Sequence, residues 1–188
     1  SDDILKSYDA TLNLLADLGA ELEVFMSPIA YDDMAQFNGA ITMYEGYRNH
    51  QHLYDDPSKS MDQNVKKRML DGRDITPQKH ADLLSKRQDH QLIFKNAMAD
   101  FDVLVTPTII EHAPKLDEID EDFTPGYFTR SFNYIDMSAL ALPTAYTSNG
   151  LPTSLQIVVP AGQEDYVVQM GKALESALAL NKQPNLSP

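Results

Sequence analysis

Two apolar, β-rich runs separated by an asparagine–glycine pair constrain the fold of this chain more than any other feature. The runs cover residues 139–146 and 153–159, and Asn149-Gly150, the commonest hairpin dipeptide, lies between them. The full connection is longer than a two-residue hairpin. Pro143 inside the first run predicts a sheet edge, a bulge or the end of a strand. The sequence therefore predicts two strands joined by a turn.

Helical patterns accompany these strands. Apolar spacing predicts helices over residues 4–18, 32–52 and 163–180, and a short basic helix is expected at residues 61–71, where Asp71-Gly72 closes it. Thr76-Pro77 offers an N-cap followed by proline at the first helical position, so a further helix is expected from there to about Asp100. Short strands are predicted at residues 22–24 and 103–105, and the second has no alternation, so both of its faces should be covered. This mixture of elements is typical of an α/β protein.

The length and composition favour one folded unit. A chain of 188 residues fits one ordinary domain or a large part of a bigger one. Apolar residues make up 43% and charged residues 23%, which excludes disorder over the whole chain. No internal repeat, low-complexity tract or linker is visible, so we expect residues 1–188 to form a single unit.

The charge and the chain start bear on partners and location. A net charge of −13 argues against binding to nucleic acids or to anionic membranes. No apolar run approaches the roughly 18 residues of a membrane span, and the first residues show no signal-peptide pattern. The chain begins without methionine, so we expect it to be processed or cut from something longer. The absence of cysteine fits a reducing compartment, and we expect a cytoplasmic protein.

Catalytic and metal-binding motifs are missing from the sequence. No Gly-x-Ser-x-Gly occurs, and Ser85 and Lys86 are adjacent in a predicted helix, so their side chains diverge. His50 and His52 would point to different sides of a helix, and the acidic run at 117–122 does not match an EF-hand. We therefore predict no catalytic residue, no metal and no cofactor in this chain.

Two polar residues lie on the apolar face of the long helix that begins at Pro77. Arg87 and Gln91 are one turn apart among apolar neighbours. A buried arginine needs a partner, so Arg87 either forms a structural ion pair or lines a polar pocket. The residues alone leave both interpretations open.

Three stretches resemble the amidase signature family. Residues 101–108 (FDVLVTPT) are similar to its DVLLTPT strand, residues 128–143 (FTRSFNYIDMSALALP) to its FTRPFNYLGLPALSVP segment, and residues 150–158 (GLPTSLQIV) to GLPVGLQIV. Residues 18–24 (LGAELEV), Glu45 in its helix and residues 68–76 (RMLDGRDIT) fit the same family in order. The resemblance covers nearly the whole chain. Ser131, Asp136 and Ser138 depart from it, because they stand where proline, glycine and proline are usual, and Asp136 places a charge beside a segment expected to be buried.

The resemblance implies the C-terminal part of an α/β amidase fold, with a mixed central sheet covered by helices. Family members use a lysine, a cis-serine and a serine nucleophile from a Gly/Ser-rich signature in their N-terminal part, and this run has no counterpart in the 188 residues. Loops from the C-terminal part help to form the walls of the substrate cleft. By position, this implies substrate-binding roles for the following residues: Thr108, Ile109, Phe128, Thr129, Arg130, Phe132 and Asn133.

The role of Arg130 has two interpretations. Its guanidinium can hold a substrate carboxylate, or it can act as a structural clamp on a loop carbonyl or on Asp136. The chain as a whole is predicted to be a C-terminal fragment of a serine-dependent amidase acting on linear, small-molecule amides. The alternatives are a non-catalytic partner module, a split or degenerate amidase-like subunit, or part of a glutamyl-tRNA amidotransferase A-type subunit. Expected partners are the N-terminal portion of the same protein or a second copy in a homo-oligomer.

Overall fold

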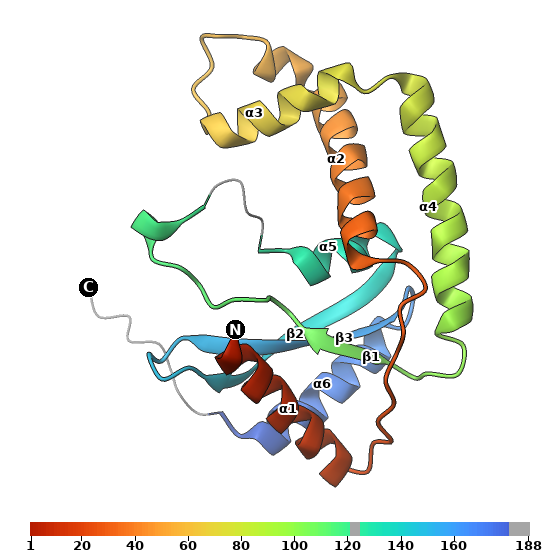
Figure 1. Cartoon of the computed structure of the whole chain (residues 1–188), viewed down its shortest axis with the longest axis vertical. Helices are drawn as coiled ribbons and strands as arrows, with labels where there is room; N and C mark the ends of the chain where they lie inside the picture. Colours follow the sequence, from red (N-terminus) through yellow and green to blue (C-terminus); the bar gives the residue numbers. More distant parts are fainter. Residues whose placement is uncertain (121–124, 181–188) are drawn as a thin grey trace. The chain divides into compact units, whose positions relative to one another are not determined.

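The computed structural model describes residues 1–120 and 125–180 (Figure 1). These residues form two compact units, each assembled from segments that are distant in the sequence. The first unit contains residues 1–26, 101–119 and the chain from Met137 onward, and the second contains residues 27–100 and 120–136. Strands and helices together confirm the predicted α/β class. The expectation that residues 1–188 act as a single unit stays a prediction.

The first unit is built around a three-stranded antiparallel sheet in the order β1-β3-β2. Its strands are β1 (Leu104–Pro107), β2 (Met137–Tyr146) and β3 (Pro152–Pro160). The two apolar runs therefore form β2 and β3, as predicted, and the turn between them contains Gly150 at a φ of 80°. Among the described strands, β2 lies at an edge of the sheet, and its register shifts between Pro143 and Ala145. Both outcomes were expected from a proline within the run.

Helices α1 (Asp2–Asp17) and α6 (Glu164–Leu178) cover one face of this sheet. The core between them contains Leu155, Ile157 and Val159, which alternate along β3 and so point to the same side. Val167 and Leu174 of α6 pack on these residues, in agreement with the amphipathic helix predicted at 163–180. Burial of this apolar face is the main contribution to the stability of the unit.

Buried hydroxyl groups fix α1 on the two long strands. Ser7 Oγ lies 2.9 Å from Thr144 Oγ1 and 2.7 Å from Thr153 Oγ1, and all three side chains are buried. Thr144 follows Pro143 at the position where the register shifts. The bulge therefore lies beside a polar contact whose donors and acceptors satisfy one another away from water.

The second unit is helical, and α2 (Tyr31–Tyr54) contacts each of the other helices of the unit: α3 (Gln63–Asp71), α4 (Pro77–Ala97) and α5 (Tyr127–Tyr134). Short 3-10 turns are found at Gly72–Asp74 in this unit and at Leu116–Glu118 in the first. Thr76 Oγ1 accepts a hydrogen bond of 3.1 Å from the backbone N–H of Lys79, so the predicted N-cap of α4 is confirmed. α2 is interrupted at His50, whose φ of −125° lies outside the helical region.

One sequence prediction about the fold is wrong, and another is confirmed with an added detail. Residues 22–24 were expected to be a strand, but this segment pairs with no strand in the described chain. The segment has the alternating sequence pattern of a strand, but no described strand pairs with it. Asp136 was expected to place a charge beside a buried segment, and it does: Tyr134 and Ile135 are 0% and 3% exposed, while the Asp136 side chain itself is exposed and its φ is 60°. A left-handed residue favours glycine, and aspartate is one of the few other residues that tolerate it, which explains the position in conformational terms.

Candidate functional site

Five of the seven predicted substrate-binding residues lie on one short helix, α5, in the second unit. They are Phe128, Thr129, Arg130, Phe132 and Asn133. The helix was not predicted from the sequence, because residues 127–134 have no capping side chain at the start and only two turns of apolar spacing. Its first turn is closed by hydrogen bonds to the Gly126 carbonyl oxygen, from the Arg130 N–H at 2.9 Å and from Thr129 Oγ1 at 3.2 Å.

The other two predicted residues, Thr108 and Ile109, follow β1 in the first unit and are half-buried. The Thr108 N–H donates to the Ser154 carbonyl oxygen at 3.1 Å, which extends the pairing of β1 with β3 by one residue. Thr108 Oγ1 is shielded from solvent and has no hydrogen-bond partner within the described residues. A buried hydroxyl without a partner is costly, so this oxygen is available to a ligand atom.

Phe132 is part of the hydrophobic core of the second unit. Its side chain is 1% exposed, and its ring meets the rings of Tyr31 and Phe94 edge-on at 6.0 and 6.4 Å. Phe128 lies at the border of the same aromatic cluster, with its ring 5.5 Å from that of Tyr31, and is half-buried. α5 therefore turns Phe132 inward, while Phe128 keeps part of its surface in contact with solvent.

Arg130 differs from the neighbouring residues of α5 in its polar contacts. Its side chain is half-buried, and its guanidinium has no hydrogen bond or ion pair with any residue in the ranges 1–120 and 125–180. A clamp on Asp136 is one of the two interpretations raised by the sequence, and no such contact exists in the structure. The donors of the Arg130 guanidinium are therefore unused within the described residues.

Arg87 is a structural clamp, although its partner is not the carboxylate that the sequence led us to expect. Its Nε donates to the Tyr134 carbonyl oxygen at 2.6 Å, and Nη2 donates to the Asn133 carbonyl oxygen at 3.1 Å. These carbonyls lie at the C-terminal end of α5, where backbone oxygens have no helical partner and where positive charge is favourable. Arg87 of α4 therefore holds the end of the helix that carries Arg130.

A second contact joins α4 to the end of α5. The Tyr134 hydroxyl lies 3.1 Å from His90 Nδ1, and burial raises the pKa of this tyrosine. Burial, together with the charge of Lys86, lowers the pKa of His90. The neutral imidazole is thus favoured at the position where it faces the tyrosine hydroxyl.

The residues that depart from the family pattern have structural partners. Ser131 is buried, and its Oγ donates to the Tyr127 carbonyl oxygen at 3.1 Å. Ser138 Oγ donates to Glu164 Oε1 at 2.5 Å, and this hydrogen bond is the main cause of the lowered pKa of Glu164. Ser138 thereby ties the start of β2 to the first turn of α6.

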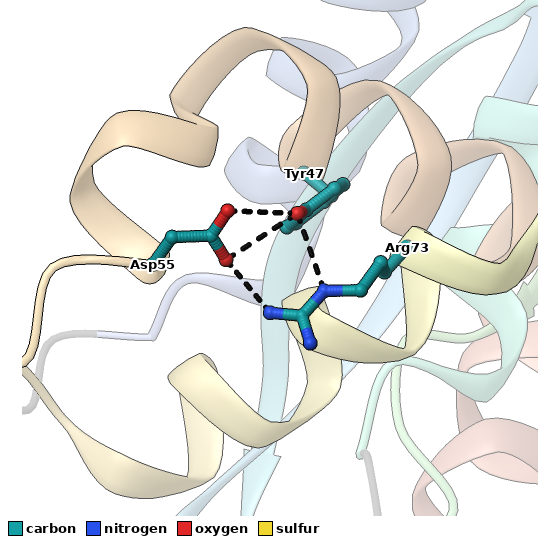
Figure 2. A network of polar contacts seen from close by, with 3 residues as sticks. All are labelled: Tyr47, Asp55 and Arg73. Atoms are coloured by element: carbon teal, nitrogen blue, oxygen red, sulfur yellow. Dashed lines mark hydrogen bonds and ion pairs between the residues drawn. The ribbon is translucent and has the colours of Figure 1, made fainter.

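Figure 2 shows a polar network in the second unit that the sequence did not reveal. The Tyr47 hydroxyl donates to Asp55 Oδ2 at 3.0 Å, and Arg73 donates from Nη2 to Asp55 Oδ1 at 2.7 Å and from Nε to the Tyr47 hydroxyl at 3.2 Å. Hydrogen bonds donated by Arg73 and then by Tyr47 lower the pKa of Asp55, and the hydrogen bonds that Arg73 donates to Tyr47 and Asp55 raise the pKa of Arg73. Asp55 and Arg73 are 8 and 26 positions away from Tyr47, and no sequence motif links the three residues.

An open depression of about 390 Å³ lies beside this network. It is lined by Arg48, Gln51, His52 and Asp55. The network ties the turn after α3 to the end of α2, so its evident role is to fix these two elements.

Within residues 1–120 and 125–180, no three histidine or acidic side chains are close enough to hold a metal ion. Part of the acidic run at 117–122 lies outside the described residues. Every described helix is too short or too polar to cross a bilayer.

Comparisons with known proteins agree with this architecture. The A-type subunit of glutamyl-tRNA(Gln) amidotransferase from Halothermothrix orenii is 35% identical over 104 residues, which cover 53% of this chain and 21% of that protein. The 6-aminohexanoate-cyclic-dimer hydrolase of Paenarthrobacter ureafaciens is 31% identical over 96 residues, covering 43% of this chain and 20% of the relative. A solved amidase superposes with a TM-score of 0.82 at 23% identity, over 94% of this chain and 42% of its own.

The chain spans less than half the length of these relatives. The structural likeness at 23% identity shows the fold, and the family assignment comes from the sequence. The family model described as Amidase matches residues 1–168, which include both strands of the hairpin and all seven predicted substrate-binding residues. The chain therefore belongs to the Amidase family.

Proposed function

We propose that this chain is the C-terminal portion of a serine-dependent amidase that hydrolyses linear, small-molecule amides. The observation that carries the proposal is the match of residues 1–168 to the Amidase family model. This chain covers 42% of a solved amidase. The serine and lysine residues that perform the chemistry would then lie in polypeptide outside the 188 residues, which contain no Gly/Ser-rich signature. This chain would contribute sheet strands and walls of the substrate cleft.

Each unit, taken by itself, has one group that supports a role in substrate binding. Arg130 has a guanidinium with no partner in the described chain, and Thr108 has a shielded hydroxyl with no partner there. A guanidinium can hold a carboxylate in two parallel hydrogen bonds, and a threonine hydroxyl can donate to an amide or carboxylate oxygen. In the proposed role, Ile109 supplies an apolar contact beside Thr108 in the first unit. In the second unit, Phe128 supplies an apolar contact, Thr129 and Asn133 flank Arg130, and Phe132 supports α5 from the core.

The first test concerns the purified chain 1–188. It is expected to show no hydrolysis of aryl amides and no stoichiometric labelling by a serine-reactive phosphonate, because it lacks a nucleophile with an adjacent base and an oxyanion-stabilising donor set. Turnover or stoichiometric labelling would refute the proposal. The reading frame upstream of the Ser1 codon provides an independent check, since a Gly/Ser signature encoded there favours an amidase over a non-catalytic module.

The second test separates binding from architecture at two arginines of the native protein. Arg130→Lys is expected to reduce kcat/KM by about 1–3 kcal/mol of transition-state stabilisation while leaving Tm nearly unchanged. The reason is that its guanidinium has no described partner whose loss would destabilise the fold. Arg87→Lys is the matched control, since it weakens the clamp on α5 and should lower Tm. If Arg130→Lys lowers Tm and not kcat/KM, Arg130 is a structural residue.

A second candidate function is favoured by several relatives that share one name. The more extensive of the two sequence matches described above is to a protein named as the A-type subunit of glutamyl-tRNA(Gln) amidotransferase. In this case the native protein would release ammonia from glutamine as one subunit of a larger assembly. Ammonia release from glutamine that depends on charged tRNA would support this function, whereas hydrolysis of simple amides without tRNA would support the first. The net charge of −13 favours the first.

The proposed partners follow from the same assignment. The N-terminal portion of the same protein would complete the fold, and a second copy would form a homo-oligomer. No nucleic acid or membrane contact is proposed, and the absence of cysteine fits the cytoplasm.

A further inference from the structure

Four polar side chains line the open depression of about 390 Å³ in the second unit: Arg48, Gln51, His52 and Asp55. Residues three, four and seven positions after Arg48 lie on the same side of a helix, so the four side chains share one side of the end of α2. His50, where the helix is interrupted, does not line the depression, so one member of the His-x-His pair contributes. The proposed function uses none of these residues.

Arg48 lies over two tyrosine rings and leaves its donors unused. Its guanidinium carbon is 5.3 Å from the centroid of the Tyr44 ring and 5.9 Å from that of the Tyr47 ring. The guanidinium makes no hydrogen bond or ion pair with any residue in the ranges 1–120 and 125–180. A cation–π contact supplies no oxygen acceptor, so the five N–H donors remain without one. Arg48 therefore offers the donor pair that carboxylate and phosphate groups accept.

The network in Figure 2 holds one of these two tyrosines in place. The Tyr47 side chain is 4% exposed, and its hydroxyl donates to Asp55 Oδ2 at 3.0 Å and accepts from Arg73 Nε at 3.2 Å. Because burial fixes the ring and the hydrogen bonds fix the hydroxyl, Tyr47 is a rigid support for Arg48. A donor that is positioned in advance loses less conformational entropy when it binds a ligand.

The one carboxylate among the four lining residues already has partners. Asp55 accepts hydrogen bonds from Arg73 Nη2 at 2.7 Å and from the Tyr47 hydroxyl at 3.0 Å. The side chains of Gln51 and His52 are exposed and make no hydrogen bond or ion pair within the part of the chain that the structure describes. The depression thus presents a guanidinium, an amide and an imidazole without polar partners, beside a carboxylate whose charge is compensated.

The chain around the depression is positively charged, although the protein is strongly acidic. Residues 48–73 carry six lysine or arginine residues and four aspartates, whereas the whole chain has a net charge of −13. The charge of Lys66 acts on the depression itself: after the hydrogen bonds from Arg73 and Tyr47, it also lowers the pKa of Asp55. A local excess of positive charge attracts anions and raises their concentration at the surface.

We propose that this depression binds a small oxyanion, with a carboxylate or phosphate group held by the Arg48 guanidinium in two parallel hydrogen bonds. The Gln51 amide and the His52 imidazole, on the same side of α2, donate to the remaining oxygens. The inference goes beyond the proposed function, because it assigns a ligand to residues with no part in amide hydrolysis. The depression is open, so weak binding with a Kd on the order of 1 mM is expected.

The test is isothermal titration calorimetry of the full-length native protein at low ionic strength, with inorganic phosphate and, separately, with succinate. Arg48→Gln is expected to weaken binding at least tenfold and to leave Tm nearly unchanged, because the side chain is exposed. Lys59→Gln is the matched control. It removes the same charge from an exposed side chain of the same positive stretch, outside the lining residues, and should change the affinity less than twofold.

The two probes identify the ligand group. Binding of phosphate alone assigns a phosphate, binding of succinate alone assigns a carboxylate, and binding of both assigns their shared oxyanion chemistry. His52→Ala is expected to weaken binding at least threefold, and it keeps the test decisive if Arg48→Gln does not fold.

Two results would overturn the inference. One is the absence of binding by either probe at about ten times the expected Kd. The other is an equal loss of affinity in Arg48→Gln and Lys59→Gln, which would mean that the anion responds only to the general charge of the region. Neither result bears on the proposed function, since these variants alter no residue assigned to amide binding.

Discussion

Gly72→Ala is expected to destabilise the second unit by about 3 kcal/mol, the upper end of the usual cost of overpacking. A Cβ atom at Gly72 would lie 2.0 Å from the Met43 carbonyl oxygen and 2.4 Å from its carbonyl carbon. Both atoms belong to the backbone of α2, so no side-chain rotation relieves the contact. The φ of Gly72 is −66°, which any residue can adopt, so the close approach alone requires glycine.

Urea unfolding of the Gly72→Ala variant, followed by far-UV circular dichroism, measures the loss. Gly39→Ala is the matched control: Gly39 lies within α2, has no atom within 4 Å of a built Cβ, and should gain roughly 0.5–1 kcal/mol as alanine. Arg73 is the next residue, so the variant should also break its hydrogen bonds to Asp55 and Tyr47. Equal stability of Gly72→Ala and wild type would show that the turn after α3 does not approach α2 in solution.

Phe132→Ala is expected to cost about 3–5 kcal/mol, as for other fully buried phenylalanines. The ring is 1% exposed and meets the rings of Tyr31 and Phe94 edge-on. Its removal leaves a cavity at the point where α5 packs on α2 and α4. Because α5 also carries Arg130, the loss should reduce the population of folded protein before it changes substrate affinity.

Phe128→Ala provides the comparison on the same helix. Phe128 is half-buried at the border of the cluster, so the expected cost is about 1 kcal/mol, below that of removing a fully buried side chain. Thermal unfolding of both variants measures the difference. A Phe132→Ala variant with the Tm of wild type and a raised KM would instead place Phe132 in the cleft, contrary to its position in the core.

The sequence predicted most helices because their signals are local. Residues 163–180 repeat apolar side chains every three or four positions, and Thr76-Pro77 combines a capping side chain with a preset φ, so both signals exist without any tertiary contact. The hairpin was predicted for a similar reason, since Asn149-Gly150 and Pro143 determine turn and edge behaviour by backbone chemistry. Helix α5 was not predicted from the sequence, because it lacks such local signals.

The candidate site shows where local signals end. The resemblance to the family pointed to Phe128 and Arg130, but it did not separate the core residue Phe132 from its neighbours. The partner of Arg87 could not be predicted from the sequence either, because the Asn133 and Tyr134 carbonyls become acceptors only when α5 ends beside α4. No sequence spacing predicts the network of Tyr47, Asp55 and Arg73.

By itself, the sequence determined the α/β class, the hairpin, five of the six α-helices in residues 1–120 and 125–180 to within a few residues, the N-cap of α4 and the family resemblance. These depend on interactions between residues a few positions apart, or on motifs read directly. Tertiary structure alone decided that residues 22–24 have no partner strand among the described residues, that Asp136 is exposed in a left-handed conformation and that Arg87 closes the end of α5. Each of these outcomes depends on which distant backbone groups come into contact. Hydrophobic burial brings these groups together, and because it is non-directional, no local sequence pattern predicts the contacts.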